Sequence, residues 1–515
     1  MPVGLPVPAS DSVRTTAGAR ARAFFASHRV EVLLGVAVAL FTLAVRFVEL
    51  EPIEIGGDAL NKWHFVRQWF HRFDLLQVAW DHHLSRMGVN VPTAFVQILF
   101  GRRAPVYHVA SLAASTLVAV LVYVAGVMAH GRAAGLLAVV WLALFPAWVR
   151  AGSQLSPDSF GAAWAALALV FLLAYGRDDP RRRLWLVLSG LAAGGAYLAK
   201  EPLVFFIPGA LLGVFMLRRS VRDVLLYAVV PLGVFALETL FYRSVSHYSS
   251  RFAIVSATHG KDPELTRKYL VIDHVWDALG RFSDLPDYYY PLLVVALAAA
   301  VLLPFLTKDK RVWAVLAFPA SFFFCYTFAF RHLSPLTLWT RFLARYLDAG
   351  VPFAALAAVL LVTVGAERLL LLVKPSPVLR ARAESLGPFA GGALLVAVFA
   401  WICAEHPLKE PHPWQETARF EHVLTDAYRR GVPIVARGGG PNGYRALKAA
   451  YSVYIDDDVL LADGKLPRYA DAYASRDRMV RPGAPAAPEG CVVKIWMHDR
   501  FLELDDRAAK RAECH

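Results

Sequence analysis

Two aspartates stand in short polar segments beside long apolar runs, where a carboxylate could act as a general base. Asp58 follows two glycines just after the first apolar run, and Asp158 ends a polar segment between two later runs. A carboxylate at such an interface can stay ionised and accept a proton from a hydroxyl. Each acid also has a structural interpretation. Asp58 can cap a helix, and Asp158 can lie in the first helical turn behind a Ser156 cap and Pro157.

Basic and aromatic side chains at the ends of apolar runs are candidates for binding a phosphate. Lys200 separates two runs, whereas Arg341, Arg345 and Tyr346 precede a later one. Arg103 follows a short amphipathic stretch. Such a basic residue can simply extend to the membrane surface, or it can hold a phosphate there. Basic residues that face a cavity at membrane depth are unfavourable unless they have a role, so they count as functional candidates.

A third constellation, Asp81-His82-His83, could ligate a divalent metal ion, and His247 or His259 could complete the site. Imidazole and carboxylate groups are common ligands of such ions. Neighbouring residues rarely point the same way, however, so the competing interpretation is a set of polar loop residues. The sequence leaves both interpretations open.

No other cofactor is indicated. The four cysteines show no zinc-binding spacing. Cys491 and Cys514 could form a disulfide in an oxidising compartment, or they could be two free thiols. The Gly-rich run 438–443 lacks the GK[ST] that follows in a phosphate-binding loop.

Composition indicates that lipid surrounds much of this chain. Of its 515 residues, 57% are hydrophobic and only 18% are charged, whereas soluble domains average about 25% charged residues. The formal charge of +13 comes from Lys and Arg in short segments between apolar runs. This is the pattern of cytoplasmic loops, and it argues against a nucleic-acid partner. We therefore predict an all-α polytopic membrane protein in contact with membrane lipids.

Crossing a hydrocarbon core of about 30 Å takes roughly 20 apolar residues in a helix, and about eleven runs approach that length. The first run is too long for a signal peptide and follows several arginines, which predicts a retained span with its N-terminus inside. The third to sixth runs are short enough that one could be re-entrant. The predicted spans are about 30–50, 106–128, 133–150, 157–175, 184–199, 203–217, 223–242, 289–306, 312–330, 346–365 and 387–404.

Basic residues predict the orientation of these spans in the cell (inner) membrane. With the N-terminus inside, the short loops rich in Arg and Lys become inner loops, and an odd number of spans places the tail outside. The expected domains are a cytoplasmic tail (1–29), a membrane domain (30–404) with outer loops about 51–106 and 242–290, and an extracytoplasmic domain (405–515). The predicted inner loops are 130–132, 177–183, 218–222, 308–311 and 368–382.

The outer segments carry regular patterns of their own. Apolar residues recur at three- and four-residue spacing in 58–73, which predicts a helix that could lie on the membrane surface. A second amphipathic stretch covers 91–100. The tail predicts a small α/β domain, with helices at 414–430 and 444–451 and β-like runs at 432–436 and 492–496.

Taken in order, four motifs resemble the GT-C glycosyltransferases, particularly the branch of protein O-mannosyltransferases and bacterial aminoarabinose transferases. They are an acid after the first span (GGDA), a short helix before Gly and a basic residue (VPTAFVQILFGRR), a Pro–polar–Asp pattern (FPAWVRAGSQLSPDSFGAAWAALAL) and a Gly-rich span ending in Lys (GLAAGGAYLAKEP). ARYLDAGVPF, at 344–353, is similar to the family's Arg-Tyr motif. The resemblance covers roughly 30–365. Two departures are that Ala59 replaces a second acid and that Asp81–His83 replaces a His-Pro-Pro-Leu-like stretch.

The resemblance implies a membrane glycosyltransferase that moves a sugar from a polyprenyl-phosphate donor to a lipid, glycan or protein acceptor outside the membrane. Asp58 is then the candidate general base, with Asp158 as a second catalytic candidate. Lys200 and Arg345, with Arg103 or Arg150, would offset the charge on the leaving lipid phosphate. Two other classes compete. A transporter or lipid flippase would carry internal repeats and mid-bilayer ionisable residues, and a non-catalytic envelope scaffold would use the tail.

Overall fold

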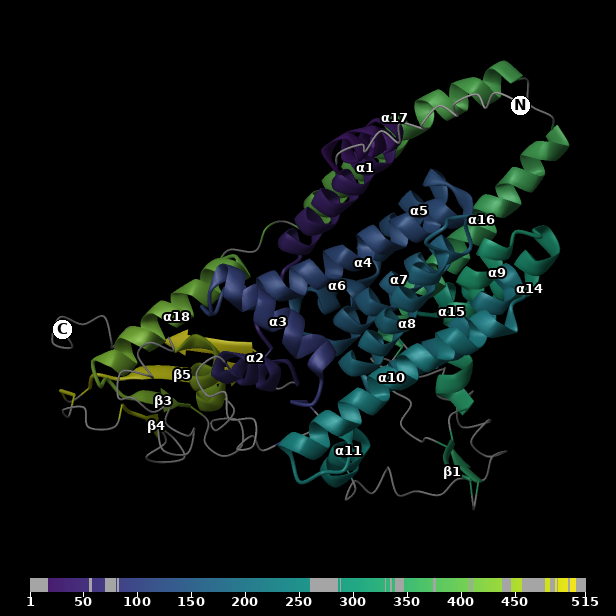
Figure 1. Cartoon of the computed structure of the whole chain (residues 1–515). Coiled ribbons are helices and arrows are strands. Elements are labelled where there is room, and N and C mark those ends of the chain that lie inside the picture. Colours follow the sequence, from purple (N-terminus) through teal and green to yellow (C-terminus); the bar gives the residue numbers. More distant parts are fainter. Residues whose placement is uncertain are drawn as a thin grey trace, which may run out of the picture.

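The computed structural model is a bundle of long helices with a small sheet domain beside one end (Figure 1). It describes residues 17–54, 58–69, 80, 83–259, 286–287, 289–328, 330–333, 336–338, 347–373, 377–406, 408, 411–437, 446–455, 478–481, 487–488, 490–498 and 501–505. Structural statements below concern these residues.

The first half of the bundle is built from helices, several of which coincide with predicted apolar runs. They are α1 (Ala17–Val48), α2 (Asp58–Trp69), α3 (Met87–Phe100), α4 (Val106–His130), α5 (Arg132–Leu144), α6 (Pro146–Ser153), α7 (Pro157–Tyr175), α8 (Arg182–Ala199), η2 (Glu201–Phe205), α9 (Phe206–Arg218), α10 (Val221–Val245) and α11 (Arg251–His259).

The second half adds more helices and two small sheets. The helical elements are α14 (Tyr289–Leu306), α15 (Lys310–Phe328), η4 (Asp348–Gly350), α16 (Val351–Val373), α17 (Pro377–Glu405), α18 (Pro413–Arg429) and a π-helical turn, η5 (Ala450–Tyr454). The strands are β1 (Phe330–Leu333), β2 (Leu336–Leu338), β3 (Ile434–Ala436), β4 (Arg478–Met479), β5 (Val493–His498) and β6 (Phe501–Asp505).

Seven helices in the described part of the chain are long and apolar enough to cross a membrane, and eight if a bent pair counts as one span. The structure therefore confirms a helical, multi-pass protein, while the predicted count of about eleven stays a prediction. Side chains such as Leu33, Leu237 and Phe305 are more than 60% exposed on the outside of this bundle. Such a surface is expected to face lipid, because exposure of a continuous apolar exterior to water is unfavourable.

The predicted span 133–150 is two helices, α5 and α6, bent by 76° at Phe145-Pro146. Pro146 has no N–H, so it cannot donate to the carbonyl of Leu142 four residues earlier. The buried guanidinium of Arg46 supplies a donor instead, with its Nη2 3.0 Å from the Leu142 oxygen. One unbroken helix over this run was therefore the wrong expectation. The break gives either a bent span or the re-entrant element that the short runs allowed.

The predicted inner loops gather at one end of the bundle. This is the end away from α18 and the sheet, toward which α16 and the start of α17 extend (Figure 1). Hydrogen bonds and ion pairs join these loops across long stretches of sequence. They connect Arg132 to Glu31, His130 to Glu367, Arg311 to the carbonyl of Met128, Arg368 to the carbonyl of Leu306, and Arg218 to Asp178.

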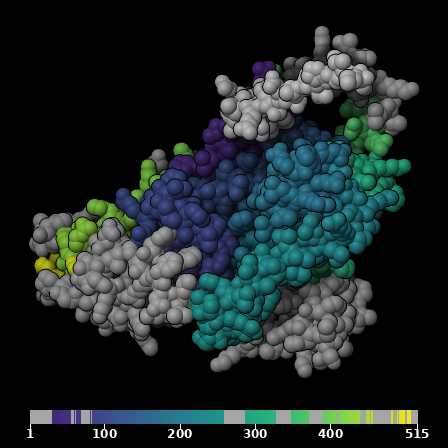
Figure 2. Space-filling view, viewed as in Figure 1, coloured from purple at the N-terminus to yellow at the C-terminus, as the bar shows by residue number. Residues whose placement is uncertain are grey.

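At the opposite end, α2 is buried within the protein. The sequence had suggested instead that this helix could lie on the membrane surface. Lys62, Trp63 and Val66 are fully buried, because α2 packs between α3 and η5 of the tail. The exposed apolar face belongs to α3 instead, where Phe95 and Leu99 are 62% and 73% exposed. In the space-filling view, the helices of the first half form one continuous surface beside the tail (Figure 2).

The tail contains the predicted α/β elements and two strands that the sequence did not reveal. Its four strands lie in the order β4-β3-β5-β6, with β3 and β5 parallel and the outer pairs antiparallel. α18 supplies Phe420 and Leu424 to an apolar cluster that also contains Trp63 and Tyr107. The tail and the first outer segment thus share one hydrophobic core.

Candidate functional site

The central feature of the site is a buried ion pair between two spans. Lys200 Nζ lies 2.6 Å and 2.9 Å from the two carboxylate oxygens of Asp158, and the side chains are only 5% and 7% exposed. Asp158 stands in the first turn of α7, where Ser156 is the N-cap as predicted. Lys200 is the first residue after α8. The sequence identified both residues, but not that they pair.

A third acid, Asp348, joins this pair. It opens η4 at the entrance of α16, and η4 packs against α7. Asp348 lies within electrostatic range of Asp158, Lys200 and Arg150, and the hydroxyl of Tyr289 donates to its carboxylate. Sequence reasoning missed Asp348, although it stands inside the Arg-Tyr segment. A signal was present, since an acid at the start of an apolar span needs a partner.

Close packing places α3 directly against this site. Gly88 touches the end of α8 so tightly that a Cβ there would lie 2.4 Å from the backbone nitrogen of Ala199, the residue before Lys200. The indole N–H of Trp164 donates to the Gly88 carbonyl at 3.1 Å. Only glycine allows this approach, so the amphipathic helix forms part of the wall around the ion pair.

A second buried charge cluster lies next to Lys200 in sequence and was not predicted. Arg251 at the start of α11 is fully buried and contacts Glu201 at 2.9 Å and Glu238 at 3.3 Å. Arg86 lies 3.7 Å from Glu201 as well. Burial is the largest single effect and opposes the charge of Arg251, but Glu201 and Glu238, together with Tyr242 and Tyr197, hold the pKa of the guanidinium above its usual value. The cluster ties α11 to the spans beside the site.

The other predicted site residues are not seen at the ion pair, and several of them lie outside the described residues. Asp58 is the first residue of α2. Arg103 lies at the tail and not at the ion pair, because its Nε contacts Glu421 of α18 at 3.3 Å while most of its side chain is exposed. Asp81, His82, Arg341, Arg345 and Tyr346 lie outside the described residues. His83 is described, and no group of three or more metal-ligating side chains occurs within the described ranges.

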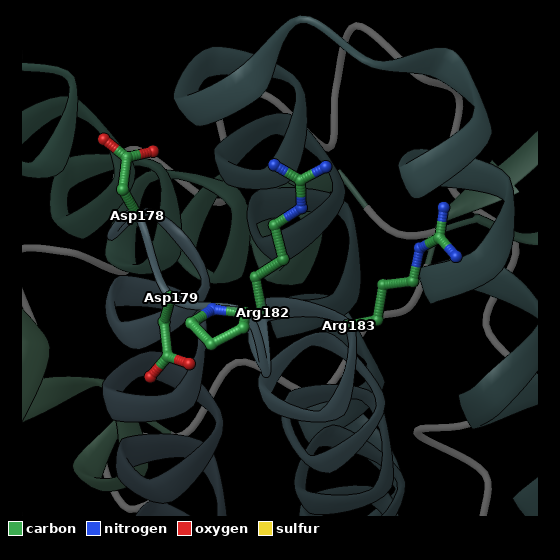
Figure 3. A pocket seen from close by; sticks show the side chains of 5 residues that line it. Asp178, Asp179, Arg182 and Arg183 are labelled. Atoms are coloured by element: carbon green, nitrogen blue, oxygen red, sulfur yellow. The ribbon is translucent and has the colours of Figure 1, made fainter. Parts of the chain in front are cut away.

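A hollow of about 440 Å³ occurs at the other end of the bundle, in the predicted inner loop between α7 and α8. It is lined by Asp178, Asp179, Pro180, Arg182 and Arg183. Figure 3 shows the two arginine side chains extending in the same general direction, whereas the two carboxylates point apart. The hollow contains none of the predicted site residues, and it is separate from the Asp158–Lys200 pair.

Several spans of a polytopic membrane protein thus bring two acids and a lysine together at the end of the bundle where the tail lies. Residues 90–242 match the family model described as dolichyl-phosphate-mannose-protein mannosyltransferase. This stretch runs from α3 to α10 and includes both Asp158 and Lys200. Over this stretch the chain is similar to that mannosyltransferase family, in agreement with the resemblance that the motifs indicated.

Two solved structures show a distant likeness to this chain. ArnT from Cupriavidus metallidurans, bound to undecaprenyl phosphate, is 17% identical with a TM-score of 0.44, over 86% of this chain and 71% of that one. The oligosaccharyltransferase AglB from Archaeoglobus fulgidus, in complex with an inhibitory peptide and a dolichol-phosphate, is 16% identical with a TM-score of 0.41, over 84% and 60%. Likeness at this level carries no argument about activity. No curated protein matches the chain.

Proposed function

We propose that the protein transfers a sugar from a polyprenyl-phosphate-linked donor to a lipid, glycan or protein acceptor on the extracytoplasmic face. The observation that carries this proposal is the buried pair of Asp158 and Lys200, with Asp348 beside it. A lipid-borne donor reaches such a site from the membrane. The match to a mannosyltransferase family over this part of the chain supports the same chemistry.

Asp58 is the proposed general base. It would take the proton of the acceptor hydroxyl while the hydroxyl oxygen attacks the anomeric carbon of the donor sugar. The bond between that carbon and the phosphate oxygen breaks, and the lipid phosphate leaves with the bonding electrons. The sugar is therefore transferred with inversion. Asp58 and not Asp158 is proposed for this role, because both oxygens of Asp158 already accept hydrogen bonds from the Lys200 ammonium.

Lys200 and Arg345 are the proposed contacts of the leaving phosphate, with Arg341 and Tyr346 beside them. Negative charge grows on the phosphate in the transition state, and a cation fixed in place stabilises that charge without having to reorganise. Asp158 fixes Lys200 through two short contacts. We assign Arg103 to the tail interface and not to the phosphate, since it pairs with Glu421.

The proposed location is the inner membrane, with the N-terminus in the cytoplasm and residues 405–515 outside as a soluble domain. Cys491 is disulfide-bonded, as expected for an oxidising compartment. The test is labelling of single-cysteine variants in intact cells with an impermeant thiol reagent, on a background with the native cysteines replaced by serine. A cysteine at Leu408 should react, and one at Asp178 should react only after lysis. The reverse pattern would overturn this orientation.

The function is tested with purified protein in liposomes that contain polyprenyl-phosphate-linked sugars, by measuring sugar transfer and release of the lipid phosphate. Wild type should transfer sugar from at least one such donor, and Asp58→Asn should lower the rate by about 10²–10⁴-fold. Unchanged transfer by Asp58→Asn would reject Asp58 as the base. A wild type that is inactive with every donor, but moves lipid across the bilayer, would favour the flippase interpretation.

A further inference from the structure

The turn between α6 and α7 holds the chain segment that leads to Asp58. Ser153 Oγ accepts from the backbone N–H of Glu51 at 3.1 Å. The side-chain amide of Gln154 makes three further contacts. Its oxygen accepts from the N–H of Glu54 at 3.1 Å and from the hydroxyl of Tyr107 at 3.0 Å, and its nitrogen donates to the carbonyl of Pro52 at 2.8 Å.

A primary amide suits this position because the contacts need an acceptor and a donor on one side chain. A carboxylate could not donate to the Pro52 carbonyl, and an aliphatic side chain could do neither. The Tyr107 hydroxyl also accepts from the backbone N–H of Leu155 at 3.1 Å, which closes the network. Gln154 and Tyr107 are both buried, so water does not replace these bonds easily.

This network joins the two segments that carry the proposed catalytic groups. Glu54 lies four residues before Asp58, and Gln154 lies four residues before Asp158. On the other side of Asp58, α2 is fixed by Arg67, which donates to two carbonyl oxygens of the tail. The segment of Asp58 is therefore anchored before and after the acid.

We propose that Gln154 is a positioning residue that sets the place of Asp58 relative to the Asp158–Lys200 pair. This inference rests on the proposed function. Gln154 touches neither donor nor acceptor in the proposal, and it acts through the backbone of Pro52 and Glu54. Its loss should therefore reduce the rate of the chemical step more than it reduces donor binding.

The kinetic test compares Gln154→Leu and Gln154→Glu with wild type in the liposome assay. A displacement of about 1 Å can lower the rate about 10²-fold, so kcat should fall by at least about tenfold in both variants, with the donor KM within about threefold. Tyr107→Phe removes only one of the three contacts of the Gln154 amide, so its kcat should fall less. Thr363→Val is the matched control, because it removes a hydroxyl that bonds only carbonyls of its own helix in the contacts seen. It should keep wild-type kinetics.

An assay that needs no activity separates the two proposals. Hydrogen exchange at single amides should show faster exchange of the Glu54 amide in Gln154→Leu, with little change at Glu51, whose partner is Ser153. The converse should hold in Ser153→Ala. An active wild type with unchanged kcat in Gln154→Leu would overturn the positioning role alone. An inactive wild type would overturn the proposed function. Unchanged exchange of the Glu54 amide would show that Gln154 does not hold this segment, and would overturn the positioning role as well.

Discussion

Removing Lys200 should destabilise the protein more than removing Asp158. Both side chains are almost fully buried and their charged atoms lie 2.6 Å and 2.9 Å apart. Breaking a buried pair from one side typically costs about 3–5 kcal/mol, because the partner keeps an uncompensated charge. Lys200→Met leaves Asp158 near Asp348, two acids within electrostatic range of each other. Its cost should lie at the upper end of that range.

Asp158→Leu should cost less, since Asp348 still offsets the charge of Lys200. The double variant Asp158→Leu/Lys200→Met removes both charges, and replacement of a buried pair by apolar groups is often close to neutral. We therefore expect the double variant to recover most of the stability lost in Lys200→Met. It should nevertheless transfer no sugar, because the cation proposed to face the phosphate is gone.

The assay is a denaturant titration of the purified protein in mixed micelles, read by intrinsic fluorescence, with transfer measured on the same preparations. Three outcomes would contradict the reasoning. Lys200→Met could cost less than about 1 kcal/mol, as exposed pairs do. Asp158→Leu could cost as much as Lys200→Met, so that Asp348 plays no part. The double variant could retain transfer, which would remove Lys200 from the mechanism.

Two other predictions follow from contacts described above, and a third tests the candidate metal ligands of the sequence. Arg67→Met should release the tail from α2, because a charged donor to two buried carbonyls is lost, and limited proteolysis should then cleave between α17 and α18 faster than in wild type. Gly88→Ala should lower stability by about 1–3 kcal/mol through overpacking and slow transfer, since its Cβ would collide with Ala199; wild-type melting would contradict this. If Asp81, His82 and His83 hold a divalent ion, one of the two interpretations that the sequence allows, EDTA should stop transfer and Mn²⁺ should restore it, whereas unaffected rates would leave them as loop residues.

Local patterns in the sequence predicted the elements well. Apolar runs gave the helices, basic loops identified the loops that meet at one end, and Ser156-Pro157 gave the start of α7 correctly. These features depend on neighbours in sequence, and physical rules for spans and caps apply to them directly. The tail helix and two of its strands were readable for the same reason.

The features that the sequence did not predict depend on contacts between residues far apart in the chain. Asp158 and Lys200 are separated by 42 positions, and no pattern in the sequence predicts that their side chains are in contact. The burial of α2 was missed because an amphipathic helix can face either lipid or protein, and its partner η5 lies near the end of the chain. The bend at Pro146 was missed because the side-chain donor to the Leu142 carbonyl comes from Arg46, a residue of another helix.

The bonds from Arg67 to Val453 and Ile455 join residues 386 and 388 positions apart, which has a consequence for biogenesis. Ribosomes deliver the chain from its N-terminus, and domains fold as they emerge. The membrane helices can therefore insert before Val453 and Ile455, the partners of α2, have been synthesised. The first outer segment would be completed only after residues 453–455 have been synthesised, so a chain that ends before them should reach the membrane with this segment open to proteases and chaperones.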